Sequence, residues 1–137
     1  MTDFVVDASV VASWLLPDEQ ATAGSPLFDA GLDGELVAPF HFQAEVANAV
    51  FRAHLRGRLD QHELQAIRSA LGRLDIAIDL DGAGRVWADA LPLALGFGIG
   101  LYDAIYLELA LRLSLPLATF DEGLAAAAER AGVQVMR

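Results

Sequence analysis

Short apolar runs alternate with longer helix-forming segments along this chain, and this alternation is the feature that most restricts its fold. A run that is apolar throughout indicates a strand buried on both faces, as in parallel sheets. Strands that alternate with helices predict an α/β domain with a mainly parallel central sheet covered on both faces, which is a three-layer α/β/α arrangement. The predicted strands are Phe4–Val6, Leu36–Ala38, Ile76–Ile78, Pro116–Ala118 and Val133–Val135.

Helix signals fill the intervals between the predicted strands. Ser9 can cap the first helix, and Pro39 can open a long one. Asp60 with Glu63 has the spacing of a capping box. Pro92 lies inside a further helical pattern, which we expect to kink or to divide into two pieces. The predicted helices are 9–16, 20–30, 39–55, 60–74, 84–95, 102–113 and 122–131.

Length and composition indicate one cytoplasmic domain. The 137 residues contain no repeat and no long linker, so we expect a single domain over 1–137. The absence of cysteine excludes disulfides, thiolate metal sites and cysteine nucleophiles, and it suits a reducing cytosol. The N-terminal segment contains the acidic residue Asp3, whereas a signal peptide would carry basic residues there. The most apolar stretch, Ala90–Tyr102, contains Pro92 and three glycines and is too short to span a bilayer.

Four acidic residues fall where an α/β domain gathers its functional side chains. In open parallel sheets, sites form outside the carboxyl ends of the strands. Asp7 directly follows the first predicted strand, and Asp121 follows the fourth. Asp103 begins a helix after a glycine-rich approach, while Glu45 lies in an apolar helix where a buried carboxylate needs a partner. Together these positions predict an acidic cluster at one edge of the sheet.

Each acid also has a purely structural explanation. Asp103 and Asp121 can be helix caps or charges that complement the helix dipole. Asp7 can be a turn residue and Glu45 can face solvent. The net charge of −10 fits an ordinary acidic protein as well as an acidic site that awaits cations. If the four acids converge, oxygen donors without histidine or cysteine favour Mg²⁺ or Mn²⁺, ions that bind phosphate and activate water.

An ordered pattern surrounds these acids. Its four segments are Phe4–Val10, Pro39 with Glu45–Ala49, Tyr102–Leu107 with Ala110, and Ala118–Asp121 with Leu124. In this order they resemble the motifs of PIN-domain nucleases, especially the VapC-type toxins of toxin–antitoxin pairs. The resemblance extends over about Asp3 to Val135. Each motif is weak alone, but four in order on a chain of this length are specific.

The resemblance implies a PIN fold, a Mg²⁺ or Mn²⁺ site and endonucleolytic hydrolysis of RNA phosphodiester bonds. It also implies a homodimer that is inhibited by a small cognate antitoxin. The positions that match are Asp7, Glu45, Asp103 and Asp121 for the acids that hold the metal, Thr119 for a supporting hydroxyl, and Ser9 and Asn48 for polar neighbours. The chain has no lysine and is strongly acidic for an RNA enzyme. These departures from the family pattern bear on the surface that would bind RNA and not on the four acidic positions.

Other residues suggest partner contacts. Arg52, Arg56 and Arg58 form the only basic concentration, and they can contact RNA phosphate or acidic antitoxin groups, or simply complement a helix dipole. The three histidines lack metal-ligand spacing and are expected at the surface or as caps. A mean hydropathy of +0.41 predicts an exposed apolar surface, which an antitoxin helix in a groove would cover.

Two other functions fit parts of the pattern. An acidic-pocket phosphatase of the haloacid-dehalogenase type needs an Asp-x-Asp motif and a lysine, but here the motif is Asp7-Ala8-Ser9 and no lysine exists. A catalytically idle PIN module that binds RNA or a protein is the alternative outside enzymology. The four intact acids favour the enzyme.

Overall fold

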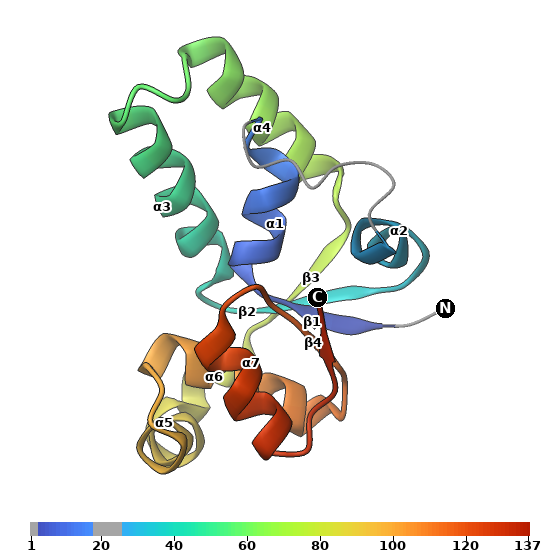
Figure 1. The fold of residues 1–137 in the computed structure, drawn as a ribbon, viewed down its shortest axis with the longest axis vertical. Helices are drawn as coiled ribbons and strands as arrows, with labels where there is room; N and C mark the ends of the chain where they lie inside the picture. The colour runs from blue at the N-terminus through green and yellow to red at the C-terminus, as the bar shows by residue number, and fades with distance from the viewer. Residues whose placement is uncertain (1–2, 18–25) are drawn as a thin grey trace.

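Five short strands form one all-parallel sheet in the order β3-β2-β1-β4-β5. The computed structural model describes residues 3–17 and 26–137 (Figure 1). The strands are β1 (Phe4–Val6), β2 (Leu36–Pro39), β3 (Ile76–Asp79), β4 (Leu117–Ala118) and β5 (Val135–Met136). The predicted α/β fold with a parallel sheet is therefore confirmed.

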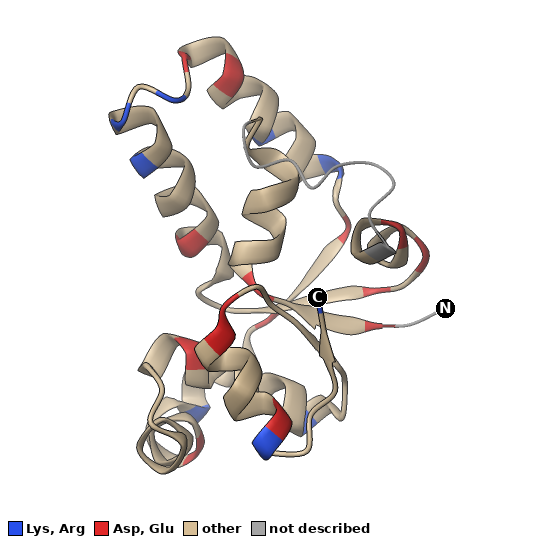
Figure 2. Ribbon diagram, in the orientation of Figure 1, with Lys and Arg blue, Asp and Glu red and all other residues tan. Residues whose placement is uncertain are grey.

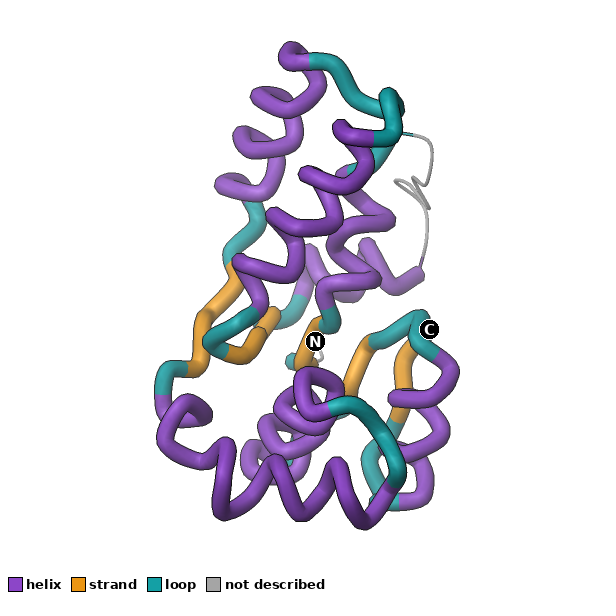
Figure 3. Tube along the Cα trace, turned by 90° about the vertical axis from the view of Figure 1, so that its left-hand side faces the viewer, coloured by secondary structure: helices purple, strands orange, loops and turns teal. Residues whose placement is uncertain are grey.

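Helices cover both faces of this sheet. On one side α3 and α4 form a long hairpin beside α1, and on the other side lie α5, α6 and α7 (Figures 1 and 3). The helices are α1 (Ala8–Leu15), α2 (Pro26–Asp33), α3 (Phe42–Leu55), α4 (Gln61–Arg73), α5 (Leu91–Phe97), α6 (Leu101–Leu113) and α7 (Glu122–Arg130).

The central strand, β1, contributes side chains to both hydrophobic cores. Successive side chains of a strand point to opposite faces. Phe4 and Val6 accordingly pack with residues of α1 to α4, whereas Val5 packs with α6 and α7. All three side chains are completely buried. The backbone end of β1 is thereby fixed between two packed layers, and Asp7 is the next residue.

Helix α6 forms the middle of the second core and is buried throughout Ala104–Ala110. Arg112 ties it to the sheet by a bidentate ion pair with Asp79, at 2.7 and 3.1 Å, and a further pair with Glu108 at 2.9 Å. In the described part of the chain no single helix is long and apolar enough to cross a membrane. The segments Asp81–Phe97 and Leu101–Leu113 are long and apolar enough only when taken together, and a bend of 111° separates them.

Two predicted helix starts are wrong. The first helix begins at Ala8 with Asp7 at its N-cap position, because the Ser9 hydroxyl donates to the Asp7 carboxylate instead of capping. The long helix begins at Phe42, because Pro39 is still paired with Asp79 in the sheet.

Two other predicted boundaries differ from those in the structure. Helix α2 continues past the predicted end at Ala30 to Asp33, and its predicted start at Gln20 lies outside the described residues. The last strand is Val135–Met136, because the Val133 N–H still bonds to Ala128 O in the turn after α7.

The capping box and the interrupted helix were predicted correctly. Asp60 accepts from the Glu63 N–H, and the Glu63 side chain accepts from the Asp60 N–H. The segment before α5 is divided into a 3₁₀ helix, Asp81–Arg85, and a π-helical turn, Val86–Ala90. Pro92 lies in the first turn of α5, where its missing N–H leaves no helical hydrogen bond unmade.

Candidate active site

Asp7 lies at the carboxyl end of β1 and its residue is only 6% exposed. Its Oδ2 accepts hydrogen bonds from Ser9 Oγ and Thr119 Oγ1, both at 2.7 Å. A buried carboxylate is costly unless such donors compensate for lost water. Among the described residues, none donates to the second oxygen, Oδ1. The side chain is thus held through one oxygen while the other stays available.

The segment after β4 fixes these two hydroxyls. Thr119 is completely buried, and its Oγ1 accepts from the Asp121 N–H at 3.0 Å. Ser9 Oγ accepts from the Phe120 N–H at 3.2 Å. Because backbone N–H groups can only donate, both hydroxyl protons are directed to Asp7. Asp121 itself is the N-cap of α7, and its Oδ1 accepts from the Leu124 N–H at 2.8 Å. The helix-cap role considered for Asp121 in the sequence is therefore present.

Glu45 lies in the first turn of α3 and is half-buried. Its Oε1 accepts from the Tyr106 hydroxyl at 2.7 Å and lies 3.2 Å from His41 Nε2. Burial raises the pKa of Glu45, the Tyr106 hydrogen bond opposes that rise, and the negative charges of Asp7 and Asp103 add to it. The carboxylate therefore does not simply face solvent.

Asp103 lies in the first turn of α6, but it does not cap the helix, because Gly100 occupies the N-cap position. Burial raises the pKa of Asp103 to about 6, and the charges of Asp121 and Asp7 contribute further. An open pocket is lined by Gly100–Asp103 and Glu45.

The four predicted acids therefore influence one another electrostatically, although they come from four separate segments. The starts of α3, α6 and α7 lie close to the carboxyl ends of β1 and β4, and acidic positions gather there (Figure 2). Mutual repulsion of this kind is expected of carboxylates that share one site.

The donor chemistry of this edge fits a hard divalent cation. The four carboxylates offer only oxygen ligands, which suits Mg²⁺ or Mn²⁺. Over residues 3–17 and 26–137, no three acidic or histidine side chains stand close enough together to hold an ion as they are placed here. Side-chain rotation or bridging water would therefore be needed to complete the coordination of a cation by Asp7, Glu45, Asp103 and Asp121.

Sequence reasoning missed two members of this cluster, His41 and Tyr106. His41 was expected at the surface or as a cap. It does occupy the N-cap position of α3, without a capping hydrogen bond from its side chain, but its ring is largely buried against Tyr102 and Tyr106, and burial is the main cause of its lowered pKa. Burial also raises the pKa of Tyr106. The available signal was helical spacing: Tyr106 comes three residues after Asp103, and so lies on the same face of the helix.

The remaining predicted residues lie farther along α3. Asn48 is exposed, one turn beyond Glu45. Arg52 and Arg56 are exposed, and Arg58 follows in the loop that leads to α4. Figure 2 shows this basic group at the tip of the α3–α4 hairpin, away from the acids. At 1.5 Å per residue, Arg52 and Arg56 lie roughly 10 and 16 Å along the helix from Glu45.

Comparison with known proteins agrees with this architecture. Ribonuclease VapC3 of Pyrobaculum aerophilum is 30% identical over 121 residues, which is 88% of this chain and 91% of that protein. The crystal structure of PAE2754 from Pyrobaculum aerophilum has a similar fold, with a TM-score of 0.68 and 20% identity over 98% of this chain and 90% of that one. The family model described as PIN domain matches residues 4–130. The resemblance drawn from the four motifs is thus confirmed, and the chain belongs to the PIN-domain family.

Proposed function

We propose that this protein is a metal-dependent endoribonuclease that acts as the toxin of a toxin–antitoxin pair. The observation that carries the proposal is the buried Asp7 carboxylate, held by Ser9 and Thr119 beside three further acids. The family and the similarity to a VapC ribonuclease support the same chemistry.

In this proposal Asp7, Glu45, Asp103 and Asp121 hold Mg²⁺ or Mn²⁺, directly or through water. When bound, the ion supplies a Lewis acid for the phosphate and an activated water. Ser9 and Thr119 keep Asp7 in place through Oδ2, so that Oδ1 can serve as a ligand. Burial, followed by the negative charges of Asp121 and Asp7, raises the pKa of Asp103, and a cation held here would relieve that repulsion and screen the acids from RNA phosphate.

The arginines at the hairpin tip are proposed to contact RNA phosphate or acidic groups of the antitoxin. Arg52 and Arg56 are exposed donors on α3 that suit either anion. Their separation from the acids means that they would hold a part of the RNA distant from the cleaved bond, or a partner bound along the hairpin.

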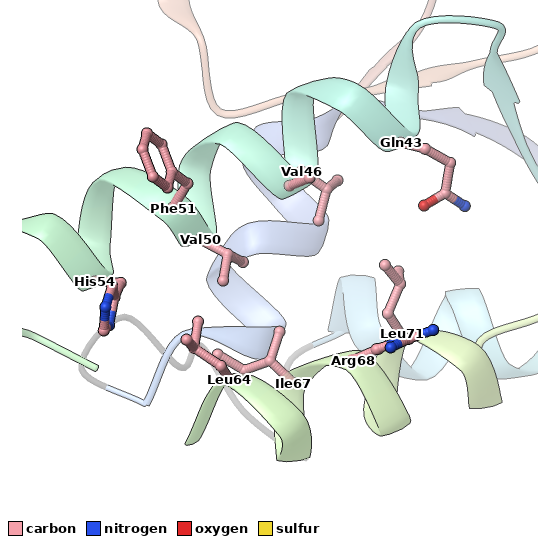
Figure 4. Close-up of a pocket in the computed structure, with 10 residues that line it drawn as sticks. Gln43, Val46, Val50, Phe51, His54, Leu64, Ile67, Arg68 and Leu71 are labelled. Atoms are coloured by element: carbon pink, nitrogen blue, oxygen red, sulfur yellow. The ribbon is translucent and has the colours of Figure 1, made fainter. Parts of the chain in front are cut away.

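An apolar pocket between α3 and α4 is the proposed antitoxin groove (Figure 4). Val46 and Val50 of α3 face Leu64 and Ile67 of α4 across it. An amphipathic helix would bury its apolar face there.

A homodimer is proposed on a separate apolar surface. Trp87 is 83% exposed and Leu95 is 77% exposed near α5, which is unusual for side chains of this size. Burial of these side chains against a second copy would remove this apolar area from water.

The decisive experiment is incubation of a mixed cellular RNA pool with purified protein in Mg²⁺, Mn²⁺ or EDTA, followed by mapping of the cut ends. Asp7→Asn is the test variant, and Asp89→Asn, an exposed acid outside the cluster, is the matched control. Discrete metal-dependent cuts that only Asp7→Asn loses support the proposal. RNA binding without cutting would indicate an idle PIN module, and hydrolysis of a phosphomonoester alone would indicate a phosphatase.

A further inference from the structure

The Tyr106 hydroxyl joins three of the four segments that carry the acids. Tyr106 is completely buried on α6, one turn beyond Asp103. Its oxygen accepts from the Ala8 backbone N–H at 3.2 Å, directly after Asp7, and its proton goes to Glu45 Oε1 at 2.7 Å. The N–H can only donate, so the direction of both hydrogen bonds is fixed.

The His41 ring lies beside the same carboxylate oxygen. Its Nε2 lies 3.2 Å from Glu45 Oε1 and 3.2 Å from the Tyr102 carbonyl oxygen. Because a carbonyl oxygen can only accept, Nε2 carries the hydrogen and donates it to Tyr102, so that the approach of Nε2 to Glu45 is a close contact. Side-chain relative exposure of His41 is 11%, so the ring cannot easily leave this position.

Glu45, like Asp7, is held through one oxygen. Two hydroxyls donate to Asp7 Oδ2, whereas Glu45 Oε1 accepts from the Tyr106 hydroxyl and has the His41 ring beside it, and no described residue donates to the other oxygen of either carboxylate. A buried donor and a packed ring at one oxygen restrict rotation of the Glu45 carboxylate. Neighbours that orient ligands in this manner strongly affect metal sites, and their loss typically weakens metal binding roughly 10–100-fold.

We propose that Tyr106 is a positioning residue that holds Glu45 through Oε1 and keeps its Oε2 available as a metal ligand near Asp7, and that the packed His41 ring supports this placement. The inference rests on the proposed metal-dependent site and extends it to two residues that are not acids. Tyr106 has the larger role, since it also fixes the backbone that leads from Asp7 into α1.

The test is the affinity for Mn²⁺ of the metal-free protein, measured by electron paramagnetic resonance of free Mn²⁺, which requires no RNA. Tyr106→Phe keeps the buried ring and removes only the hydroxyl. We expect its Mn²⁺ affinity to fall by about ten-fold or more. Ser13→Ala is the control: it removes a half-buried hydroxyl that donates to the Val10 carbonyl on α1, away from the four acids, and its affinity should equal that of the wild type.

A double-mutant cycle separates positioning from general structural damage. If Tyr106 acts through Glu45, then Tyr106→Phe weakens Mn²⁺ binding much more in the wild type than in Glu45→Gln, where no carboxylate remains to be positioned and only the Ala8 hydrogen bond is lost. An equal loss in both backgrounds, or no loss in the wild type, would overturn the inference. Failure of the wild type to bind Mn²⁺ at all would instead contradict the proposed function.

His41 gives an independent route if Tyr106→Phe does not fold. His41→Ala removes the ring that packs beside Glu45 Oε1 while leaving the Ala8 hydrogen bond intact. Its Mn²⁺ affinity should fall in the wild type and remain unchanged in Glu45→Gln. Circular dichroism spectra of all variants identify those that are folded.

Discussion

Thr119 Oγ1 lies 2.7 Å from Asp7 Oδ2, although 112 positions separate the two residues in the sequence. The contact exists because β1 and β4 are neighbours in the sheet, with Val6 beside Ala118. Both strands end at this edge, so their next residues meet. The parallel pairing of two strands thus creates the buried hydroxyl–carboxylate contact at the centre of the proposed site.

Loss of this contact should affect both stability and activity. Thr119→Val keeps the volume but leaves Asp7 with one hydroxyl donor and the Asp121 N–H without its acceptor. We expect a loss of about 1–3 kcal/mol in the free energy of unfolding and roughly 10–100-fold in RNA cleavage. Urea denaturation and cleavage rates measure the two effects. Thr119→Ser retains the hydroxyl, and a Ser variant as impaired as Val would argue against the hydrogen bond as the cause.

The acid cluster should destabilise the metal-free protein at neutral pH. The pKa of Asp103 is raised to about 6 in the folded state, so the folded protein binds the proton more tightly than the unfolded chain does. This contribution to stability is fully present below about pH 4 and is lost as the pH rises through 6. Asp103→Asn should therefore stabilise the protein in EDTA by about 1 kcal/mol at pH 7 after allowance for solvent screening.

Thermal unfolding in EDTA between pH 4 and 8 measures this effect. Asp89→Asn, at an exposed position outside the cluster, is the control and should change little. If Asp103→Asn were less stable than the wild type at pH 7, the ionised carboxylate would be held favourably, contrary to the burial and the repulsion that raise its pKa.

The ion pair between Asp79 and Arg112 should have the opposite pH dependence. The Arg112 guanidinium is the main cause of the lowered pKa of Asp79. Stability from this pair is present above the unfolded pKa of about 4 and is lost as the pH falls through the lower folded pKa. We expect Asp79→Asn to reduce the free energy of unfolding by about 2 kcal/mol at pH 7. Urea denaturation should show this difference shrinking on acidification, and a difference that grows would contradict the assignment.

The apolar groove offers a test of partner binding that leaves the acids untouched. Ala47 is an exposed lining residue on α3, so Ala47→Arg should be tolerated by the fold while it blocks an incoming helix. If the proposed antitoxin binds there, we expect its inhibition of the Ala47→Arg variant to be at least about ten-fold weaker, with the RNA cleavage rate unchanged. The control is Ala126→Arg, which places the same charge at an exposed position of α7. Inhibition of this variant by the proposed antitoxin should match that of the wild type.

The fold, and the gathering of acids at one edge of the sheet, could be predicted because the information is local. Apolar runs identify buried strands, and segments that follow parallel strands meet at one edge, which is where Asp7 and Asp121 lie. The start of α3 was misplaced because Pro39 suits both a strand end and a first helical turn, and only its pairing with Asp79 decides between them.

The contacts of Glu45 could not be predicted in the same way. Its hydrogen bond with Tyr106 joins α3 to α6 across 61 positions, and it depends on how far each helix is rotated about its axis. Tertiary packing sets that rotation. The sequence placed Tyr106 on the same helix face as Asp103, but nothing in it indicated that the hydroxyl would reach Glu45.

The central claim is that the four acids act as one metal site, and the cleavage rate of a single cut RNA in Mn²⁺ tests it most directly. Asp7→Asn, Asp103→Asn and the double variant are compared with the wild type at equal protein and metal concentrations. Residues that act as one unit are strongly non-additive. Each single variant should lose about 100-fold or more, and the double variant should be scarcely slower than either. Full activity in both single variants would show that the acids do not form the site.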